Sequence, residues 1–214
     1  MDSAFNSKME TKTMKKVNVR NMTVTAMLSA IGFILMYLDT ATPFAPSFLK
    51  MDISDLPALI ASFALGPVWG VAVSLIKNVL HLPVSSSSCI GELSNFILCS
   101  SFVLPAGLIY HHKKTKKNAI LGAFVGLVVM SAMALPSNLF LIYPLYYKIG
   151  FAKEALMGMY QEIADKVFPF MNLDSMAKCI LYFNVPFTFV KGMLSAVITI
   201  FIYQPLRPLL KGNN

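Results

Sequence analysis

One apolar stretch near the C-terminal end constrains the fold most. The run FNVPFTFVKGMLSAVITIFIY, from Phe183 to Tyr203, contains a single charge, Lys191. About 20 apolar residues are enough for an α-helix to cross a bilayer, and lipid tolerates no unpaired backbone groups, so this run predicts a membrane helix. Because a charge inside the hydrocarbon is costly, Lys191 is expected to face the protein interior, a partner or a ligand.

Similar apolar runs recur along the whole chain. Hydrophobic residues make up 56% of it and charged residues only 13%, against about 25% charged in ordinary globular domains. The sequence predicts an all-α membrane protein, with one domain over residues 21–209 behind a polar tail, 1–20, that we expect to be disordered. Its six transmembrane helices are predicted at residues 21–38, 55–69, 70–84, 91–110, 118–147 and 177–206.

The second and third of these spans are short. Gly66-Pro67-Val68-Trp69-Gly70 is the only turn signal between them. One broken helix is the alternative, but a proline flanked by glycines favours a helical hairpin.

The distribution of basic residues predicts the orientation. The two termini and the HHKKTKK loop, which six crossings place on one side, hold eleven lysines and arginines, and the opposite side holds five. By the positive-inside rule, both termini are expected in the cytoplasm. The net charge of +8 is therefore interpreted as a result of this topology, with anionic lipid as the counter-charge. No nucleic-acid partner is expected.

Several kinds of chemistry lack their sequence motifs. The chain has no GxxxxGK[ST] phosphate loop, no HExxH or GxSxG motif and no pair of carboxylates within a span, so ATP hydrolysis by that route is excluded and an intramembrane enzyme is disfavoured. Cys89, Cys99 and Cys179 have no metal-binding spacing and are expected to be buried, inert thiols. A disulfide between Cys89 and Cys179 stays open.

Polar residues inside the last span share one helical face. Asn184, Thr188 and Lys191 recur at helical spacing, and Ser195 continues the row. Asn and Thr often simply join neighbouring membrane helices through hydrogen bonds. A structural lysine would need an acid at its depth, and no acid is apparent for Lys191.

The third span carries a similar row, Ser74, Lys77, Asn78 and His81. With a turn near Pro67, Asp55 lies level with this row, so we predict a structural Asp55–Lys77 ion pair. His81 is interpreted as a packing residue with its polar atoms satisfied. Glu92 opens the fourth span, where a helix N-terminus accommodates its charge, and it is expected to lie farther out than Lys191.

The fifth span adds Asn138, followed by three tyrosines in LIYPLYY. Interfacial tyrosines commonly form an aromatic belt, but Asn138 lies deeper. Asn138, Asn184, Thr188 and Lys191 together offer donors and acceptors near aromatic walls. Such a set suits a planar, mostly uncharged ligand.

The segment FLKMDISDLPALIASFALGP, followed by SLIKNVLHL, GELSNFI and NVPFTFVKG, resembles the substrate-binding S components of energy-coupling-factor (ECF) vitamin transporters. The resemblance extends from about Thr23 to Leu209 and is strongest with riboflavin-binding members. It implies a six-helix fold in the bacterial cell membrane, with a ligand pocket in the extracellular half. The first outer loop, about Asp39–Ser54, closes that pocket in the family.

The resemblance also implies which residues bind the substrate. Carried over position by position, they are Phe48, Leu49, Asn95, Asn138, Thr188 and Lys191. Asn184 is added to this set because it lies on the same helical face as Thr188 and Lys191. Riboflavin is then the bound substrate, with no separate cofactor and no metal.

The family further implies protein partners, one transmembrane T subunit and two ATPase subunits. Ala26 and Ala30 match the small-residue spacing with which family members dock on the T subunit, although ordinary internal packing would give the same spacing. The rival predictions are an S component for pantothenate or thiamine, an intramembrane enzyme, and a structural membrane subunit.

Overall fold

The computed structural model describes residues 19–41, 45–46, 49–85, 87–167 and 173–211, with side chains described as far as Tyr203. Within these residues the chain is almost entirely helical, with one short antiparallel pairing of Thr40–Ala41 with Lys50–Met51. The elements in chain order are α2 (Val19–Tyr37), β1 (Thr40–Ala41), β2 (Lys50–Met51), α3 (Asp55–Ala64), α4 (Pro67–His81), η1 (Leu82–Val84), α5 (Ile90–His112), α6 (Lys116–Ser137), η2 (Asn138–Ile142), α7 (Tyr143–Lys148), α8 (Lys153–Val167), α9 (Met176–Cys179), η3 (Ile180–Asn184) and α10 (Val185–Lys211).

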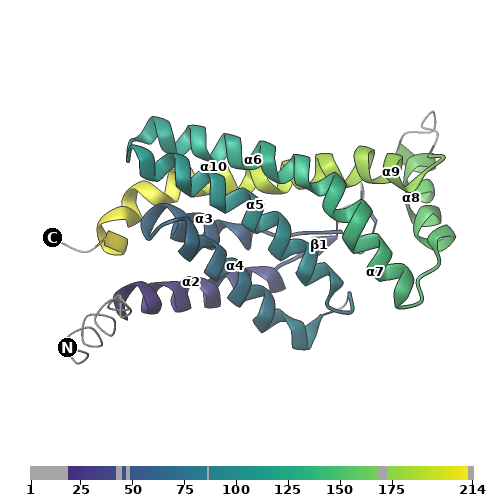
Figure 1. Cartoon of the computed structure of the whole chain (residues 1–214), viewed down its shortest axis with the longest axis horizontal. Coiled ribbons are helices and arrows are strands. Elements are labelled where there is room, and N and C mark those ends of the chain that lie inside the picture. The colour runs from purple at the N-terminus through teal and green to yellow at the C-terminus, as the bar shows by residue number, and fades with distance from the viewer. Residues whose placement is uncertain (1–18, 42–44, 47–48, 86, 168–172, 212–214) are drawn as a thin grey trace, which may run out of the picture.

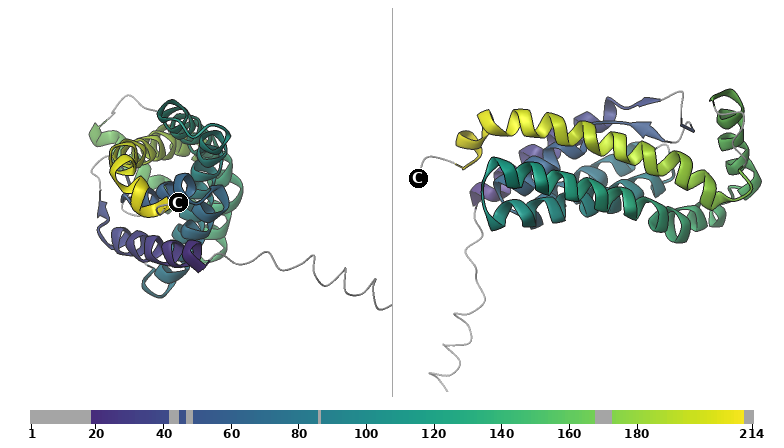
Figure 2. Two further views of the ribbon diagram at one scale, coloured as in Figure 1. Left: turned by 90° about the vertical axis from the view of Figure 1, so that its left-hand side faces the viewer. Right: turned by 90° about the horizontal axis from the view of Figure 1, so that it is seen from above.

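The long helices run alternately up and down one elongated bundle (Figure 1). The first turn of α2 and the last turns of α10 lie at the same end, which we call the terminal end. The β1–β2 pair, α8 and α9 lie toward the opposite end, which we call the loop end (Figures 1 and 2).

Among the residues that the structure describes, five helical segments are long and apolar enough to cross a membrane. They are Val19–Tyr37, Pro67–Val84, Ile90–His112, Lys116–Lys148 and Met176–Tyr203. Each of them overlaps a predicted span. The remaining predicted span corresponds to α3, an apolar helix of only 10 residues, so the structure supports a multi-pass protein with five full-length candidates.

The predicted hairpin is present between α3 and α4. The first helix ends at Ala64 and the second begins at Pro67, a favourable residue in a first helical turn. Gly66 between them has φ 125°, a conformation that residues with a Cβ rarely adopt. The alternative of one broken helix is therefore wrong.

Glycines allow α5 and α6 to pack closely along their length. A Cβ at Gly126 would lie 2.4 Å from the backbone oxygen of Phe102, and one at Gly122 would lie 2.6 Å from that of Ala106. Small residues bring membrane helices close enough for extensive van der Waals contact. This contact holds the α5–α6 pair as a firm wall of the bundle.

Helix α8 was not predicted from the sequence. It buries Leu156, Tyr160 and Ala164, which recur every four residues, against an apolar cluster at the loop end. Its other face is charged, as in the exposed pair Lys166–Glu162. This one-sided helix is too polar to be a membrane span, so the apolar runs of the sequence do not indicate it.

All three cysteines are free. Cys99 and Cys179 are buried, as expected. Cys89 is exposed, so the expectation of burial was wrong there: it precedes α5 in a left-handed conformation with φ 66°.

Candidate substrate-binding site

A cavity of about 400 Å³ opens at the loop end of the bundle. Its walls come from the last turns of α2, α4 and α6, the first turns of α5 and α10, the elements η2, α7 and η3, and the segment around β2. Its volume falls in the range of about 300–1,000 Å³ that is typical of small-molecule sites.

Six of the seven predicted substrate-binding residues line this one cavity. They are Leu49, Asn95, Asn138, Asn184, Thr188 and Lys191. The seventh, Phe48, lies outside the described residues. The fold thus brings together residues from four distant parts of the chain, and their contact with a ligand stays a prediction.

Lys191 has an acidic partner, contrary to the expectation. Its Nζ donates to Asp52 Oδ2 at 2.9 Å, and the two side chains are only 11% and 8% exposed. The backbone N–H of Ser54 donates to the other carboxylate oxygen at 2.8 Å and fixes the carboxylate's orientation. The expectation failed because Asp52 reaches Lys191 from the loop between β2 and α3. Spacing along the membrane spans does not indicate such a partner.

The predicted pair of Asp55 with Lys77 is confirmed directly behind the cavity. Lys77 Nζ lies 2.7 Å from Asp55 Oδ1 and also donates to the hydroxyl of Ser54 at 2.7 Å. Both charged side chains are completely buried. Ser54 therefore joins the two ion pairs, through its backbone to Asp52 and through its hydroxyl to Lys77.

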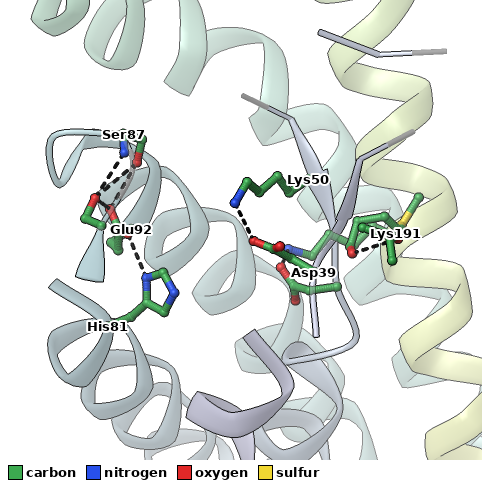
Figure 3. Close-up of polar contacts among 10 residues, drawn as sticks. Asp39, Lys50, His81, Ser87, Glu92 and Lys191 are labelled. Carbon is green, nitrogen blue, oxygen red and sulfur yellow. Dashed lines mark hydrogen bonds and ion pairs between the residues drawn. The ribbon is translucent and has the colours of Figure 1, made fainter. Parts of the chain in front are cut away.

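His81 and Glu92 form a third polar group on the cavity wall (Figure 3). His81 Nδ1 lies 2.8 Å from Glu92 Oε1, and the hydroxyls of Ser85 and Ser87 donate to Glu92 Oε2 at 2.7 and 3.2 Å. Nδ1 of His81 has a polar partner and the ring packs in the bundle, as expected, but the side chain also lines the cavity. For its partner Glu92, the sequence predicted only that the N-terminus of a helix accommodates the charge.

The lysines along this cavity are compensated by acids. Lys50 pairs with Asp39 at 2.9 Å beside the β1–β2 pair, Lys191 pairs with Asp52, and His81 contacts Glu92 (Figure 3). Among the described residues, no lining lysine is left without a carboxylate. An anionic ligand would therefore have to compete with a carboxylate for each lysine.

Two π-helical turns position the lining asparagines. Asn138 begins η2 and Asn184 ends η3, and such turns occur often at functional sites. The amide of Asn138 donates to the backbone oxygen of Ala134 at 2.7 Å, and no described residue donates to its Oδ1. This oxygen is available to a ligand.

Asn184 is held by two buried tyrosines. The hydroxyl of Tyr160 donates to Asn184 Oδ1 at 2.6 Å, Asn184 Nδ2 donates to the hydroxyl of Tyr143 at 3.2 Å, and the two hydroxyls contact each other. Burial raises the pKa of Tyr160, on α8, well above its ordinary value, so that hydroxyl stays protonated and remains a donor. Helix α8 thus orients an asparagine that lines the cavity.

The remaining lining is largely apolar and aromatic, and includes Tyr143, Tyr146 and Phe187. Apolar walls with a few oriented amides and hydroxyls suit a neutral molecule that has one flat apolar part and several polar edges. No cluster of histidine, cysteine and acidic residues with metal-binding geometry occurs among the described residues.

The sequence matches the family described as "ECF transporter, substrate-specific component" over residues 20–203, most of the chain. The chain belongs to this family. This S component is 34% identical over 194 residues to the riboflavin transporter RibU of Staphylococcus aureus, covering 91% of this chain and 93% of that protein. It is 29% identical over 195 residues to the riboflavin transporter FmnP of Bacillus subtilis, covering 90% and 94% of the two chains.

The fold has a relative among solved structures. A chain described under "Structure and mechanism of the S component of a bacterial ECF transporter" superposes with a TM-score of 0.69 at 31% identity, over 92% of this S component and 100% of that chain. The family and its relatives are transporter components, not enzymes.

The predicted docking residues lie away from the cavity. Ala26 and Ala30 are both exposed on α2, whereas Thr25 and Ser29 beside them are buried. Internal packing therefore does not explain the small-residue spacing. Docking on a partner stays a prediction.

Proposed function

We propose that this S component captures riboflavin and delivers it to an ECF importer in a bacterial cell membrane. The observation that carries the proposal is the gathering of Leu49, Asn95, Asn138, Asn184, Thr188 and Lys191 around one cavity, in a chain that resembles riboflavin transporters over nine-tenths of its length. Riboflavin is a neutral molecule with a flat ring system and a hydroxyl-rich side chain, which is the chemistry this lining suits.

The charge pairing favours riboflavin over the rival vitamins. Pantothenate carries a carboxylate, and Lys191, the cation that would have compensated it, is already paired with Asp52. Thiamine carries a permanent positive charge, and two of the three lining acids that would attract it, Asp39 and Asp52, are already paired with Lys50 and Lys191. A neutral ligand requires none of these pairs to open.

The lining suggests a binding pose. The ring system lies between the aromatic side chains and Lys191, whose remaining N–H groups donate to a ring carbonyl. The amide oxygen of Asn138 accepts from a ring N–H or a hydroxyl of the side chain. Leu49 and the neighbouring loop close the cavity over the bound vitamin.

The membrane topology follows from charge and fold together. We infer six crossings, with α3 as a short one, both termini in the cytoplasm and the cavity open to the outside. The support is the excess of basic residues on the terminal segments and on the loop between α5 and α6. The loop between α5 and α6 lies at the terminal end, together with the first turn of α2 and the last turns of α10, opposite the cavity (Figure 1).

Transport requires partners that supply energy. The chain has no phosphate loop, so ATP hydrolysis falls to two ATPase subunits joined through a T subunit. The exposed face of α2 with Ala26 and Ala30 is the proposed docking surface, where small side chains let a partner helix approach closely.

The test is the visible absorption spectrum of the protein purified from riboflavin-replete cells, followed by titration of the ligand-free protein with riboflavin. A yellow preparation with flavin bands, and saturable quenching of flavin fluorescence at a one-to-one ratio, are expected. Pantothenate and thiamine in excess should not displace the flavin. A colourless protein that ignores riboflavin but binds one of these vitamins would refute the proposal.

A further inference from the structure

A second cavity, of about 320 Å³, lies at the terminal end of the bundle. It is formed by the ends of α3, α5 and α10 and the start of α6, far from the substrate cavity. Tyr203 in its lining follows Lys191 by twelve residues of α10, a separation of about 18 Å along a helix. No part of the proposed transport function uses this space.

The floor of the second cavity is aromatic and has its polar atoms satisfied. Tyr203 donates to the backbone oxygen of Phe63 at 3.3 Å, and the hydroxyls of Tyr203 and Tyr110 lie 3.1 Å apart. The rings of Phe63 and Tyr110 pack against each other with centroids 4.9 Å apart. The floor therefore offers mainly apolar surface to an occupant, and Ala119 and Ile200 extend it.

The rim of this cavity is cationic. Lys114, Thr115 and Lys116 line it and all three are exposed, and none of the described lining residues is an acid. Among the described residues neither lysine has an ion-pair partner. In the substrate cavity, by contrast, carboxylates pair with the lysines, so the second cavity is the one with uncompensated positive charge.

Thr115 adds a hydroxyl to this rim. Its oxygen accepts from the backbone N–H of Asn118 at 3.2 Å, which leaves the hydroxyl proton to donate elsewhere. Two lysines and one hydroxyl above an apolar floor provide donors for a phosphate oxygen beside space for an apolar tail. Basic pockets between membrane helices on the cytoplasmic side bind anionic headgroups by this combination.

We propose that the second cavity binds the phosphate group of an anionic amphiphile, with Lys114, Thr115 and Lys116 on the phosphate and the apolar part against Phe63, Ala119 and Ile200. Phosphatidylglycerol of the surrounding membrane is the source we expect. Free inorganic phosphate offers the same headgroup chemistry without the tail. Zwitterionic phosphatidylcholine does not fit, because its ammonium group would lie among the lysines.

The loop KKTKK provides a matched pair of variants. Lys114→Gln/Lys116→Gln removes the two cavity-lining charges, and Lys113→Gln/Lys117→Gln removes two charges from the same loop at exposed positions outside the lining. Thermal unfolding of the full chain in detergent is followed while phosphatidylglycerol, phosphatidylcholine or inorganic phosphate is added. Retained helical circular dichroism shows that each variant folds.

Phosphatidylglycerol should stabilise the wild-type chain and the Lys113/Lys117 variant saturably, and phosphatidylcholine should not. The Lys114/Lys116 variant should need roughly thirtyfold more phosphatidylglycerol, because each lysine near an anionic headgroup contributes about 1 kcal/mol. Ala119→Phe, which fills the cavity without changing charge, should weaken the same response. If inorganic phosphate stabilises the protein to the same extent, the cavity still binds a phosphate group, but its ligand is free phosphate and not a lipid.

Equal responses of the two double variants would overturn the proposal, because the loop would then act only through its general charge. An unchanged response of Ala119→Phe would also overturn it, since the lipid would then lie outside the cavity.

Discussion

Lys191 on α10 and Asp52, 139 residues earlier, form an ion pair at 2.9 Å in the wall of the substrate cavity. The pair is electrically neutral as a unit, and the lysine keeps further N–H donors for a ligand. Because Asp52 lies in the segment between β2 and α3, the same pair ties that segment to the last helix. Lys191 is thus both a structural residue and a proposed substrate contact.

The first prediction separates these two roles. Lys191→Met keeps much of the apolar stem but leaves Asp52 nearly buried and unpaired, so the empty protein should lose about 3–5 kcal/mol of stability. Riboflavin affinity, measured by flavin fluorescence on the folded fraction, should also fall by about 1.5–3 kcal/mol, as expected for a hydrogen bond from a charged donor.

The double variant Asp52→Asn/Lys191→Met is the control for that prediction. With both charges gone, thermal stability should return close to that of the wild type, while riboflavin affinity should stay low. Recovery of affinity together with stability would show that Lys191 acts only through the ion pair and makes no contact with the vitamin.

The second prediction concerns the fully buried pair behind the cavity. Asp55→Asn leaves the Lys77 ammonium without its counter-charge at 0% exposure, so unfolding should become easier by about 3–5 kcal/mol. The exposed pair Lys166–Glu162 on α8 serves as the comparison, and Glu162→Gln should not measurably change the unfolding temperature. Similar losses from both variants would mean that burial does not set the strength of these pairs.

A third prediction concerns Tyr160, which does not line the cavity but holds Asn184. Tyr160→Phe removes the contact with the Tyr143 hydroxyl and the hydrogen bond to Asn184. The bond to Asn184 contributes about 1 kcal/mol and its loss lets the amide turn, so riboflavin should bind about fivefold more weakly. Tyr182→Phe, at a side chain that is 48% exposed on η3, should leave binding unchanged. If both variants bind as the wild type does, Asn184 is not a substrate contact.

The fourth prediction concerns the face of α2. Ala26→Trp or Ala30→Trp should abolish riboflavin uptake in cells with the complete transporter, while the isolated protein binds riboflavin normally, because a bulky side chain prevents close helix approach. Ala132→Trp, at an exposed alanine of α6, is the matched control and should leave uptake intact. A loss of binding at Ala26 would instead show that the residue supports the fold.

Features that depend on local pattern could be predicted from the sequence. The apolar runs located the long helices, and the turn at Gly66–Pro67 gave the register that brought Asp55 opposite Lys77. Neighbouring helices joined by a tight turn leave little freedom, so even a buried ion pair can be derived from such a segment.

Features that depend on distant segments could not be predicted in this way. Asp52 lies in a loop whose path is set by the helices around it, so its partner on α10 was invisible in the chain. The π-helical turns at Asn138 and Asn184 were not predicted either, although each ends two residues before a proline. Phe48 and Leu49 were assigned through the family resemblance alone.

The short helix α3 has a consequence for how the protein uses the thickness of the membrane. Ten residues extend for about 15 Å, roughly half of the hydrocarbon layer. A full-length helix on the same axis would fill the space that now contains the loop, Asp52 and the substrate cavity. Exposed to lipid, such irregular backbone would be unstable, whereas beside a polar cavity it can be hydrated. Riboflavin must therefore displace water from the cavity as it binds, and an apolar vitamin analogue that fills the space without replacing those hydrogen bonds should gain little affinity.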